Sequence, residues 1–351
     1  MSSFAIRVPC SSANIGPGFD VIGLALSLHL ELRVTIDDSK SSSELPLNCA
    51  ITYEDQSGST ESISLDPEVN LITRVALYVL RCHNQRAFPI ETKVHIVNPI
   101  PLSRGLGSSG TAVVAGVMLG NEVGKLGLSK DRLLDYCLMI ERHPDNVAAS
   151  LFGGFVGTYL NELKPEDVAR KEIPLSEVLP SPAGGIDTGM KPPRAPSWNR
   201  KFDWAPEIKA IAIIPDFVVP TADARNVLPQ QYSRADVVFN LQRAALLPAA
   251  LGTSPPDPEM IFLAMQDKVH QPYRKGLIPG LTEILQSMTP ATQPGLLGIC
   301  LSGAGPTILA LATDRFTEIA DRIIARFATN NITCQWKLLE PAQEGTTVTP
   351  V

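Results

Sequence analysis

The sequence predicts an α+β protein made of two domains, and three observations lead to this prediction. The chain has 351 residues, which is long enough for two domains that each bury a core. Segments with the two-residue period of strands alternate with segments of helical period in both halves. Between about residues 161 and 203, Pro, Gly, Ser and charged residues dominate without a sustained period. We therefore expect domains at 1–165 and 205–351, joined by a linker or surface excursion at 166–204.

The first half begins with alternating apolar and polar residues. Strands are expected at residues 4–8, 32–36 and 94–96. A helix is expected over residues 70–84, where Leu71, Val75 and Tyr78 share one face. A second helix follows GLGSSG through TAVVAGVMLGNEVG, and it should be buried because it is apolar on nearly every side. A third occupies LSKDRLLDYCLMIER, capped by Ser129 and ended by Pro144, and GGFVGTYL is expected to be a strand.

The second half has a recognisable order of elements. AIAII predicts a strand, RADVVFNLQRAALLPAAL and TEILQSM predict helices, and GICLS and TILALA predict two strands. DRFTEIADRIIARFA predicts a helix and ITCQWKLL a last strand, whereas the final dozen residues are expected to be frayed. This order is typical of an α+β layer with a split βαβ arrangement.

The composition excludes several classes of function. The 30 basic and 36 acidic residues leave a net charge of −6, which argues against a nucleic-acid partner. No window approaches the roughly 20 apolar residues that span a bilayer, and MSSFAIRVPC resembles a first strand rather than a signal peptide. The expected location is therefore the cytoplasm, without membrane association. Six cysteines without a CxxC pair are expected to be free thiols, and no HExxH pair suggests zinc, so a metal should be a hard ion carried by a phosphate.

The strongest chemical signal is PIPLSRGLGSSGTAVVAGV. Gly105 and Gly107 permit a tight loop with its backbone N–H groups on one side, and the helix that follows offers its free N–H groups and positive dipole end. Ser108 and Ser109 add hydroxyls for a phosphate or a magnesium ion. A Walker A loop would carry Lys where Gly107 stands. The segment predicts an anion site of another kind, with a plain helix cap as the alternative.

Two further glycine-rich segments accompany it. In PCSSANIGPGFDVIGLAL, a Gly-Pro-Gly turn holds Asn14 and Asp20 near each other, so they can bind a polar substrate or act as turn residues. In LSGAGPTILAL, two glycines flank Ala304, which indicates close backbone approach to a ligand or loop, or a tight hairpin.

The three segments, in this order, resemble the GHMP kinase superfamily over essentially the whole chain. Within it, SSANIGPGFDVIGLAL, ERHPDNVAASLFGGF, TADARNVLP and HQPYR resemble the homoserine kinases, above all the fungal ones. Gly110 and Thr111 depart from the small alanines usual after the serines. The resemblance implies a two-domain GHMP kinase fold, with an N-terminal ribosomal-S5-like domain that contains a left-handed βαβ unit and a C-terminal ferredoxin-like domain. It also implies a site in the cleft between them, and a homodimer.

The resemblance further implies a role for each matching residue. ATP would be held by Asn70, Pro101, Ser103, Arg104, Gly105, Leu106, Gly107, Ser108 and Ser109. Mg²⁺ would be held by Ser109 and Glu141, with Asp135 as the alternative to Glu141. L-homoserine would be gripped by Asn14, Asp20, Asn146, Arg225 and Arg274, with Thr221 near the reacting hydroxyl.

Each of these residues also has a purely structural interpretation. Asn70 can cap a helix, either arginine can be a surface charge, and His143 before a proline is better explained as a structural hydrogen-bonding residue. Glu141 can be a solvated charge, although a helix C-terminus disfavours a carboxylate.

The same resemblance implies direct in-line attack by the substrate hydroxyl, since the Asn146 amide cannot accept a proton at neutral pH. A neighbouring carboxylate, Asp145, would restore a base-assisted route if it pointed into the site. The alternatives are a mevalonate or phosphomevalonate kinase, and an ATP-binding regulator of the same fold without turnover.

Overall fold

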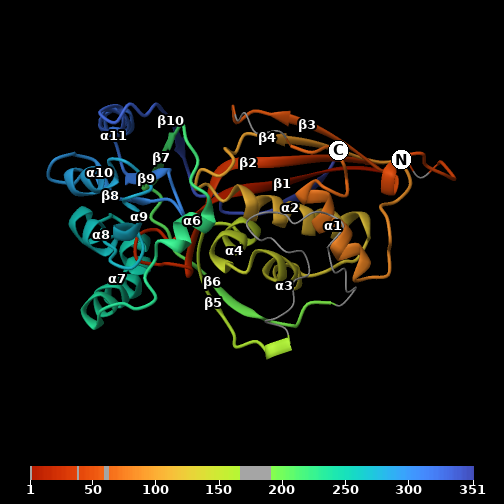
Figure 1. Ribbon diagram of the computed structural model, residues 1–351, viewed down its shortest axis with the longest axis horizontal. Helices are drawn as coiled ribbons and strands as arrows, with labels where there is room; N and C mark the ends of the chain where they lie inside the picture. Colours follow the sequence, from red (N-terminus) through yellow and green to blue (C-terminus); the bar gives the residue numbers. More distant parts are fainter. Residues whose placement is uncertain (1, 38, 59–62, 167–190) are drawn as a thin grey trace.

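The computed structural model describes residues 2–37, 39–58, 63–166 and 191–351, arranged in two adjoining sheets with helices packed on them (Figure 1). Most of the predicted 166–204 linker lies outside these residues, so its boundaries remain a prediction. Within the described residues, no helix combines the length and hydropathy needed to cross a membrane.

A seven-stranded sheet organises the N-terminal part. Its strands follow the order β11-β1-β2-β4-β3, and β5 pairs with β2 and with β6. They are β1 (Ser2–Ala13), β2 (Ile22–Ile36), β3 (Cys49–Asp55), β4 (Thr92–Asn98), β5 (Phe155–Leu160), β6 (Ser197–Phe202) and β11 (Thr347–Pro350). A 3-10 turn at Pro46–Asn48 precedes β3. The pair β3 and β4 is parallel and encloses α1, which makes a βαβ unit, whereas the other pairs are antiparallel.

Four helices lie on one side of this sheet (Figure 1). They are α1 (Leu71–Arg81), α2 (Ser108–Val123), α3 (Lys130–Glu141) and α4 (Pro144–Phe152). The expected burial of α2 is confirmed, because its apolar residues are buried around nearly the whole helix. Ser129 caps α3 by accepting a hydrogen bond from the Arg132 N–H, as predicted. Helix α4 was not predicted, although the proline at its first position is typical of a helix start.

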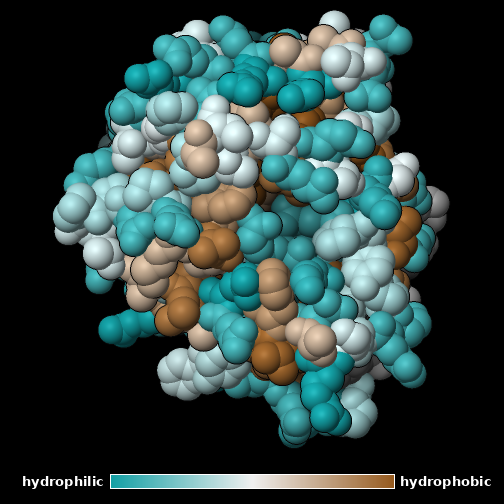
Figure 2. All heavy atoms as spheres, turned by 90° about the vertical axis from the view of Figure 1, so that its left-hand side faces the viewer, coloured by the Kyte–Doolittle hydropathy of each residue, from teal (hydrophilic) through white to brown (hydrophobic). Residues whose placement is uncertain are grey.

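The second sheet has four antiparallel strands in the order β10-β7-β9-β8. Its strands are β7 (Lys209–Pro215), β8 (Leu296–Leu301), β9 (Ile308–Ala312) and β10 (Cys334–Leu339). Because β9 lies between β7 and β8, this is the predicted split βαβ arrangement of a ferredoxin-like domain. The helices of this part are α6 (Thr221–Asn226), α7 (Arg234–Gly252), α8 (Pro258–Ala264), α9 (Gln271–Arg274), α10 (Leu281–Ser287) and α11 (Phe316–Ala328). Figure 2 views this end of the molecule, where a mainly hydrophilic surface carries scattered hydrophobic side chains.

Strand β7 is buried on both faces and joins two hydrophobic clusters. Ala210, Ala212 and Ile214 belong to the large cluster that also contains the core of the first sheet. Ile211 and Ile213 alternate with them and belong to the cluster under α10 and α11. The two domains therefore share a continuous apolar core.

Two expectations about irregular chain were wrong. The final residues are not frayed, because β11 pairs with β1 with Phe4 opposite Pro350 and Arg7 opposite Thr347. Residues 197–202 form β6 within the stretch that lacks a period. This is an edge strand with mostly exposed or half-buried residues, so it has no need of alternating apolar side chains.

Candidate active site

The three glycine-rich segments lie side by side where the two domains meet. The Gly303 N–H donates to the Ala13 carbonyl at 3.2 Å, which joins the third segment to the first. The second segment is packed against the third, because a Cβ on Gly105 would lie 2.5 Å from the Ser302 carbonyl oxygen. Tertiary structure thus gathers into one site the three segments that the sequence singled out.

The loop over residues 101–107, called here the phosphate loop, needs glycine at two positions. Gly105 has φ +84° and Gly107, which precedes α2, has φ +66°. A Cβ on Gly107 would lie 2.2 Å from the Ser11 hydroxyl. The alternative of a plain helix cap is not supported, since no side chain caps α2 at its N-terminus.

The backbone of this loop presents a row of amide groups. Among the described residues, none accepts a hydrogen bond from the N–H groups of residues 104–110. Helix α2 adds the positive end of its dipole. Free amides and a helix N-terminus together bind anions such as phosphate. Ser109 is exposed at this end of the helix.

Glu141 faces Ser109 across the turn between α3 and α4. The Ser109 hydroxyl donates to Glu141 Oε2 at 3.3 Å, and His143 Nδ1 lies 3.5 Å from Oε1. Burial lowers the pKa of His143, but the hydrogen bond and charge of Glu141 outweigh it, so the pKa is raised overall. Arg142 makes the turn possible with φ +59°. The Glu141 carboxylate, at a helix C-terminus that repels negative charge, thus contacts a hydroxyl and an imidazole.

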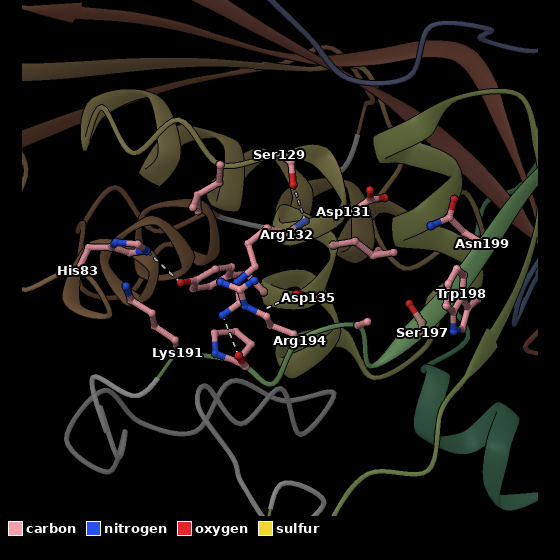
Figure 3. Close-up of a pocket in the computed structure, with 15 residues that line it drawn as sticks. His83, Ser129, Asp131, Arg132, Asp135, Lys191, Arg194, Ser197, Trp198 and Asn199 are labelled. Atoms are coloured by element: carbon pink, nitrogen blue, oxygen red, sulfur yellow. Dashed lines mark hydrogen bonds and ion pairs between the residues drawn. The ribbon is translucent and has the colours of Figure 1, made fainter.

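Asp135, the alternative magnesium ligand, lies elsewhere. It is about 9 Å from Glu141 along the axis of α3, as the helical rise predicts, and its carboxylate binds Arg132 at 2.6 Å. Asp135 and Arg132 line a hollow of about 820 Å³ at the N-terminal end of α3. Figure 3 labels their two side chains there. The structure does not bring Asp135 to Ser109. Of the two carboxylates, only Glu141 contacts Ser109, at the start of α2.

Asp20 and Arg225 form an ion pair whose charges act on His143 and Asp145. The guanidinium of Arg225 binds the Asp20 carboxylate with both terminal nitrogens, at 2.8 and 3.1 Å. Each side chain is about one-third exposed, 34% for Asp20 and 29% for Arg225. The Phe19 ring lies under Arg225, and the guanidinium carbon Cζ of Arg225 is 5.5 Å from the centre of that ring. Two of the residues predicted to bind the substrate are therefore adjacent and partly accessible.

Arg274 has a different environment, because it is only 2% exposed. Its guanidinium donates to the carbonyls of Gly303 at 2.7 Å and Ala224 at 3.1 Å, and to His270 Nδ1. Burial, followed by the charge of Arg225, lowers the pKa of Arg274 to about 10. His270, whose pKa is lowered by burial, donates from Nε2 to the Gly16 carbonyl at 2.7 Å. Arg274 and His270 therefore tie the first and third segments to α6 and α9.

The asparagines of the site are held by neighbouring groups. Asn14 accepts from the Asp20 N–H at 3.1 Å and donates to the Gly303 carbonyl at 3.3 Å. The Asn146 side-chain oxygen accepts a hydrogen bond from the Ser11 hydroxyl at 2.9 Å. Because of this contact, the side-chain oxygen of Asn146 already has a hydrogen-bond donor.

Asp145 is buried beside Asn146, with 2% of its surface exposed. Its Oδ1 accepts the Asn146 N–H at 2.8 Å. Burial, and then the negative charge of Asp20, raise the pKa of Asp145 to about 7. The carboxyl group therefore carries a proton over a pH range in which ordinary aspartates are ionised.

The remaining predicted residues border the same region. Asn70 caps α1 by accepting from the Ile72 N–H at 3.0 Å, so the capping interpretation is correct, and a base contact stays a prediction. Pro101 is buried and Ser103 exposed, while Arg104 binds Asp216 at 3.0 Å. Thr221 begins α6 two residues after Val219, whose N–H donates to the Ser103 carbonyl.

Sequence reasoning missed several residues that hold the site. Ser11, Ser12 and Ser302 stand inside the quoted motifs, but only their tertiary contacts reveal what they do. The Ser12 and Ser302 hydroxyls are 2.7 Å apart, although 290 residues separate them. Phe19 and His270 stack with ring centres 5.3 Å apart, a contact that has no local sequence signal.

Comparisons with known proteins agree on one family. The model of the GHMP kinases N terminal domain matches residues 70–154, and that of the GHMP kinases C terminal matches residues 256–329. The chain is 62% identical over 351 residues to a homoserine kinase of Saccharomyces cerevisiae, covering 99% of this chain and 98% of the relative. It is 51% identical over 348 residues to a homoserine kinase of Schizosaccharomyces pombe, covering 99% of both.

Solved structures show the same relationship. A homoserine kinase from Cytophaga hutchinsonii superposes with a TM-score of 0.74 and 26% identity, covering 99% of this chain and 98% of that one. A mevalonate kinase superposes with a TM-score of 0.62 at 12% identity, covering 97% and 99%, which shows the shared fold alone.

Proposed function

The chain belongs to the homoserine kinases, a branch of the GHMP kinases, and from this premise we propose how the residues of its site divide the work. As a homoserine kinase it is an ATP-dependent phosphotransferase that converts L-homoserine to O-phospho-L-homoserine, a step of threonine biosynthesis. The identity of 62% to a homoserine kinase over nearly the full length of both chains carries this conclusion. The division of labour among residues is our proposal.

The phosphate loop holds the phosphates of ATP. The unengaged amides of residues 104–110 and the dipole of α2 support this assignment, because both favour a polyanion. Ser108 and Ser109 supply hydroxyls at the helix start. We assign Asn70, at the start of α1, to the adenine side of the nucleotide.

The residues present fit Mg²⁺ bound together with ATP. The Ser109 hydroxyl and the Glu141 carboxylate are hard oxygen donors 3.3 Å apart, the ligand type that magnesium prefers. No cluster of three His, Cys, Asp or Glu suited to a metal occurs among the described residues, which fits an ion held mainly by phosphate oxygens. When bound, the ion would neutralise charge on the phosphates.

L-homoserine binds beside the loop. Asp20 offers a carboxylate for its ammonium group and Arg225 a guanidinium for its carboxylate. The mutual pairing of these two side chains supports this role, since a zwitterion can replace each partner with an equivalent charge. Arg274 and Asn14 both donate hydrogen bonds to the Gly303 carbonyl, and so they hold the backbone of the third segment in place beside the proposed substrate position. Thr221, at the start of α6, is assigned to the neighbourhood of the reacting hydroxyl.

The substrate hydroxyl oxygen attacks the γ-phosphorus in line while the bond from that phosphorus to the leaving ADP oxygen breaks. The hydroxyl proton passes to an oxygen of the transferred phosphoryl group, without a strong protein base. Asn146 cannot take the proton as an amide, and its oxygen is already engaged by Ser11. Asp145 is buried and directs Oδ1 at the Asn146 backbone. Phosphoryl transfer tolerates a weak nucleophile because its transition state is loose. Orientation, which can supply roughly 7–11 kcal/mol, and the loop amides would provide the catalysis.

A steady-state assay of ADP release tests the proposal. Purified protein with ATP and magnesium would be offered L-homoserine, mevalonate, phosphomevalonate and other small alcohols. Turnover confined to L-homoserine supports the assignment. Turnover of mevalonate instead, or ATP binding without any turnover, would support one of the two alternatives.

We propose a homodimer in the cytoplasm, without nucleic-acid or membrane partners. Light scattering after size-exclusion chromatography measures the oligomeric state, and a monomer at micromolar concentration would contradict it.

A further inference from the structure

Four successive carbonyl groups of the phosphate loop, those of residues 103–106, are held from outside the loop. The Ser103 carbonyl accepts from the Val219 N–H at 3.4 Å, and the Arg104 carbonyl accepts from the Thr307 N–H at 3.3 Å. The Gly105 carbonyl accepts from the Ser302 hydroxyl at 2.6 Å. The Leu106 carbonyl accepts from the Ser11 N–H at 3.3 Å. Four successive peptide units are thus gripped by their oxygen atoms.

This pattern determines the direction of the amides. In a planar trans peptide, the C=O of one residue and the N–H of the next point in opposite directions. Holding the carbonyls of residues 103–106 therefore turns the N–H groups of residues 104–107 to the opposite side. These are the amides that the proposed function assigns to the phosphates. Three of the four donors belong to the second domain, so that domain shapes the loop.

Only one of the four anchors is a side chain. The Ser302 side chain is fully buried, and its hydroxyl also contacts that of Ser12 at 2.7 Å. A hydroxyl has one proton, and the Ser302 hydroxyl donates its proton in the hydrogen bond to the Gly105 carbonyl. Ser12 must therefore be the donor in the contact between the two serines. The chain of hydrogen bonds runs from Ser12 to Ser302 to the Gly105 carbonyl. This chain of hydrogen bonds joins the first segment, through Ser12, to the third, through Ser302, and then to the second, through Gly105.

We propose that Ser302 is a positioning residue for the phosphate loop, because its hydroxyl holds the Gly105 carbonyl and thereby fixes the loop conformation in which the backbone N–H groups face the nucleotide phosphates. This inference rests on the proposed function of the loop. It assigns Ser302 no contact with ATP, only control over the loop that makes the contact. Ser12 has a secondary role, since it orients the Ser302 hydroxyl.

The test separates phosphate binding from binding of the rest of the nucleotide. Titrations of wild type and Ser302→Ala would use the magnesium complex of a non-hydrolysable ATP analogue and, separately, adenosine. We expect Ser302→Ala to bind the analogue about tenfold more weakly, since an unpaired carbonyl and a misaimed donor cost affinity. Adenosine should bind within about twofold of wild type, because it lacks the groups that the loop holds. The KM for L-homoserine should likewise be unchanged, whereas kcat/KM for ATP falls with the analogue affinity.

Two further variants control for indirect effects. Ser12→Ala keeps the hydrogen bond from the Ser302 hydroxyl to the Gly105 carbonyl. The loss of analogue affinity in Ser12→Ala should therefore be clearly smaller than in Ser302→Ala. Ser287→Ala removes a buried hydroxyl on α10 that has no partner among the described residues, and it should bind both ligands as wild type does. If Ser302→Ala does not fold, Ser302→Cys keeps a weaker donor and should show an intermediate loss.

Three outcomes would overturn the proposal. Ser302→Ala, or Ser302→Cys in its place, could bind the analogue as tightly as wild type, or it could lose the analogue and adenosine equally. In either case, Ser302 does not position the loop. If wild type itself bound the analogue no more tightly than adenosine, the loop would not be the phosphate site. The proposed function of the loop would then fail together with the inference.

Discussion

Replacing Asp145 by asparagine should stabilise the protein by an amount that grows as the pH rises. Asp145 is 2% exposed, and its pKa is raised from 3.8 to about 7, mainly by burial and then by Asp20. Between these values the folded state keeps the proton that the unfolded state has released. The stability of wild type therefore falls as the pH rises through this window, and above pH 7 the loss stays constant. The side-chain amide of Asp145→Asn would keep an oxygen acceptor for the Asn146 N–H without titrating.

The size of the effect follows from the shift. Each pKa unit corresponds to about 1.4 kcal/mol, so the full penalty in wild type is about 4 kcal/mol. Between pH 5 and pH 8, the advantage of Asp145→Asn should grow by about 3 kcal/mol, because wild type loses stability over roughly two pH units of that interval. With about 2 cal/mol/K of unfolding entropy per residue, this corresponds to a Tm difference that widens by about 4 °C.

Thermal unfolding of both proteins at pH 5, 6, 7 and 8 measures this trend. Asp321→Asn, an exposed acid on α11, serves as the control and should show no such widening. A Tm difference that stays constant or narrows with rising pH would refute the reasoning. Activity of the same variant addresses the base question. Without a base role, kcat should remain within about threefold, whereas a loss of about a hundredfold or more would assign Asp145 general-base catalysis.

Three other substitutions test the division of labour. Ser109→Ala should raise the KM for MgATP about tenfold and leave the KM for L-homoserine nearly unchanged, since one oxygen donor near the phosphates is lost; an equal rise in both would contradict the assignment. Arg225→Ala should raise the KM for L-homoserine about 10- to 100-fold with little effect on MgATP, as expected for loss of a charged hydrogen-bonding partner; Arg243→Ala, on α7, is its control in the same assay. Gly107→Ala should lower kcat/KM for ATP about a hundredfold or more, because its Cβ would lie 2.2 Å from the Ser11 hydroxyl. Gly127→Ala has a similar positive φ of +60° but open space around it, so wild-type activity in Gly107→Ala or a comparable loss in Gly127→Ala would argue against a steric cause.

Local patterns were sufficient for much of the fold. Alternating residues located β1, β2, β4 and the strands of the second sheet, and helical spacing located α1, α2, α3, α7 and α11. These elements bury one or more faces, so the period of their side chains is imposed by the core. The same patterns failed for β6 and β11, which are held by backbone pairing at sheet edges, and for the short helix α4.

The chemistry of the site divides along a similar line. Glycines and serines at the start of a buried helix suffice to predict an anion site, because the free amides and the dipole are local properties of the backbone. The pairing of Asp20 with Arg225, the burial of Arg274 and the choice of Glu141 over Asp135 depend on segments that lie far apart in the chain. The contact between Ser12 and Ser302 is of the same kind, since 290 residues separate its partners. Such contacts carry no periodic signal, and only the tertiary packing of the elements, within the first domain and between the two domains, decides which side chains meet.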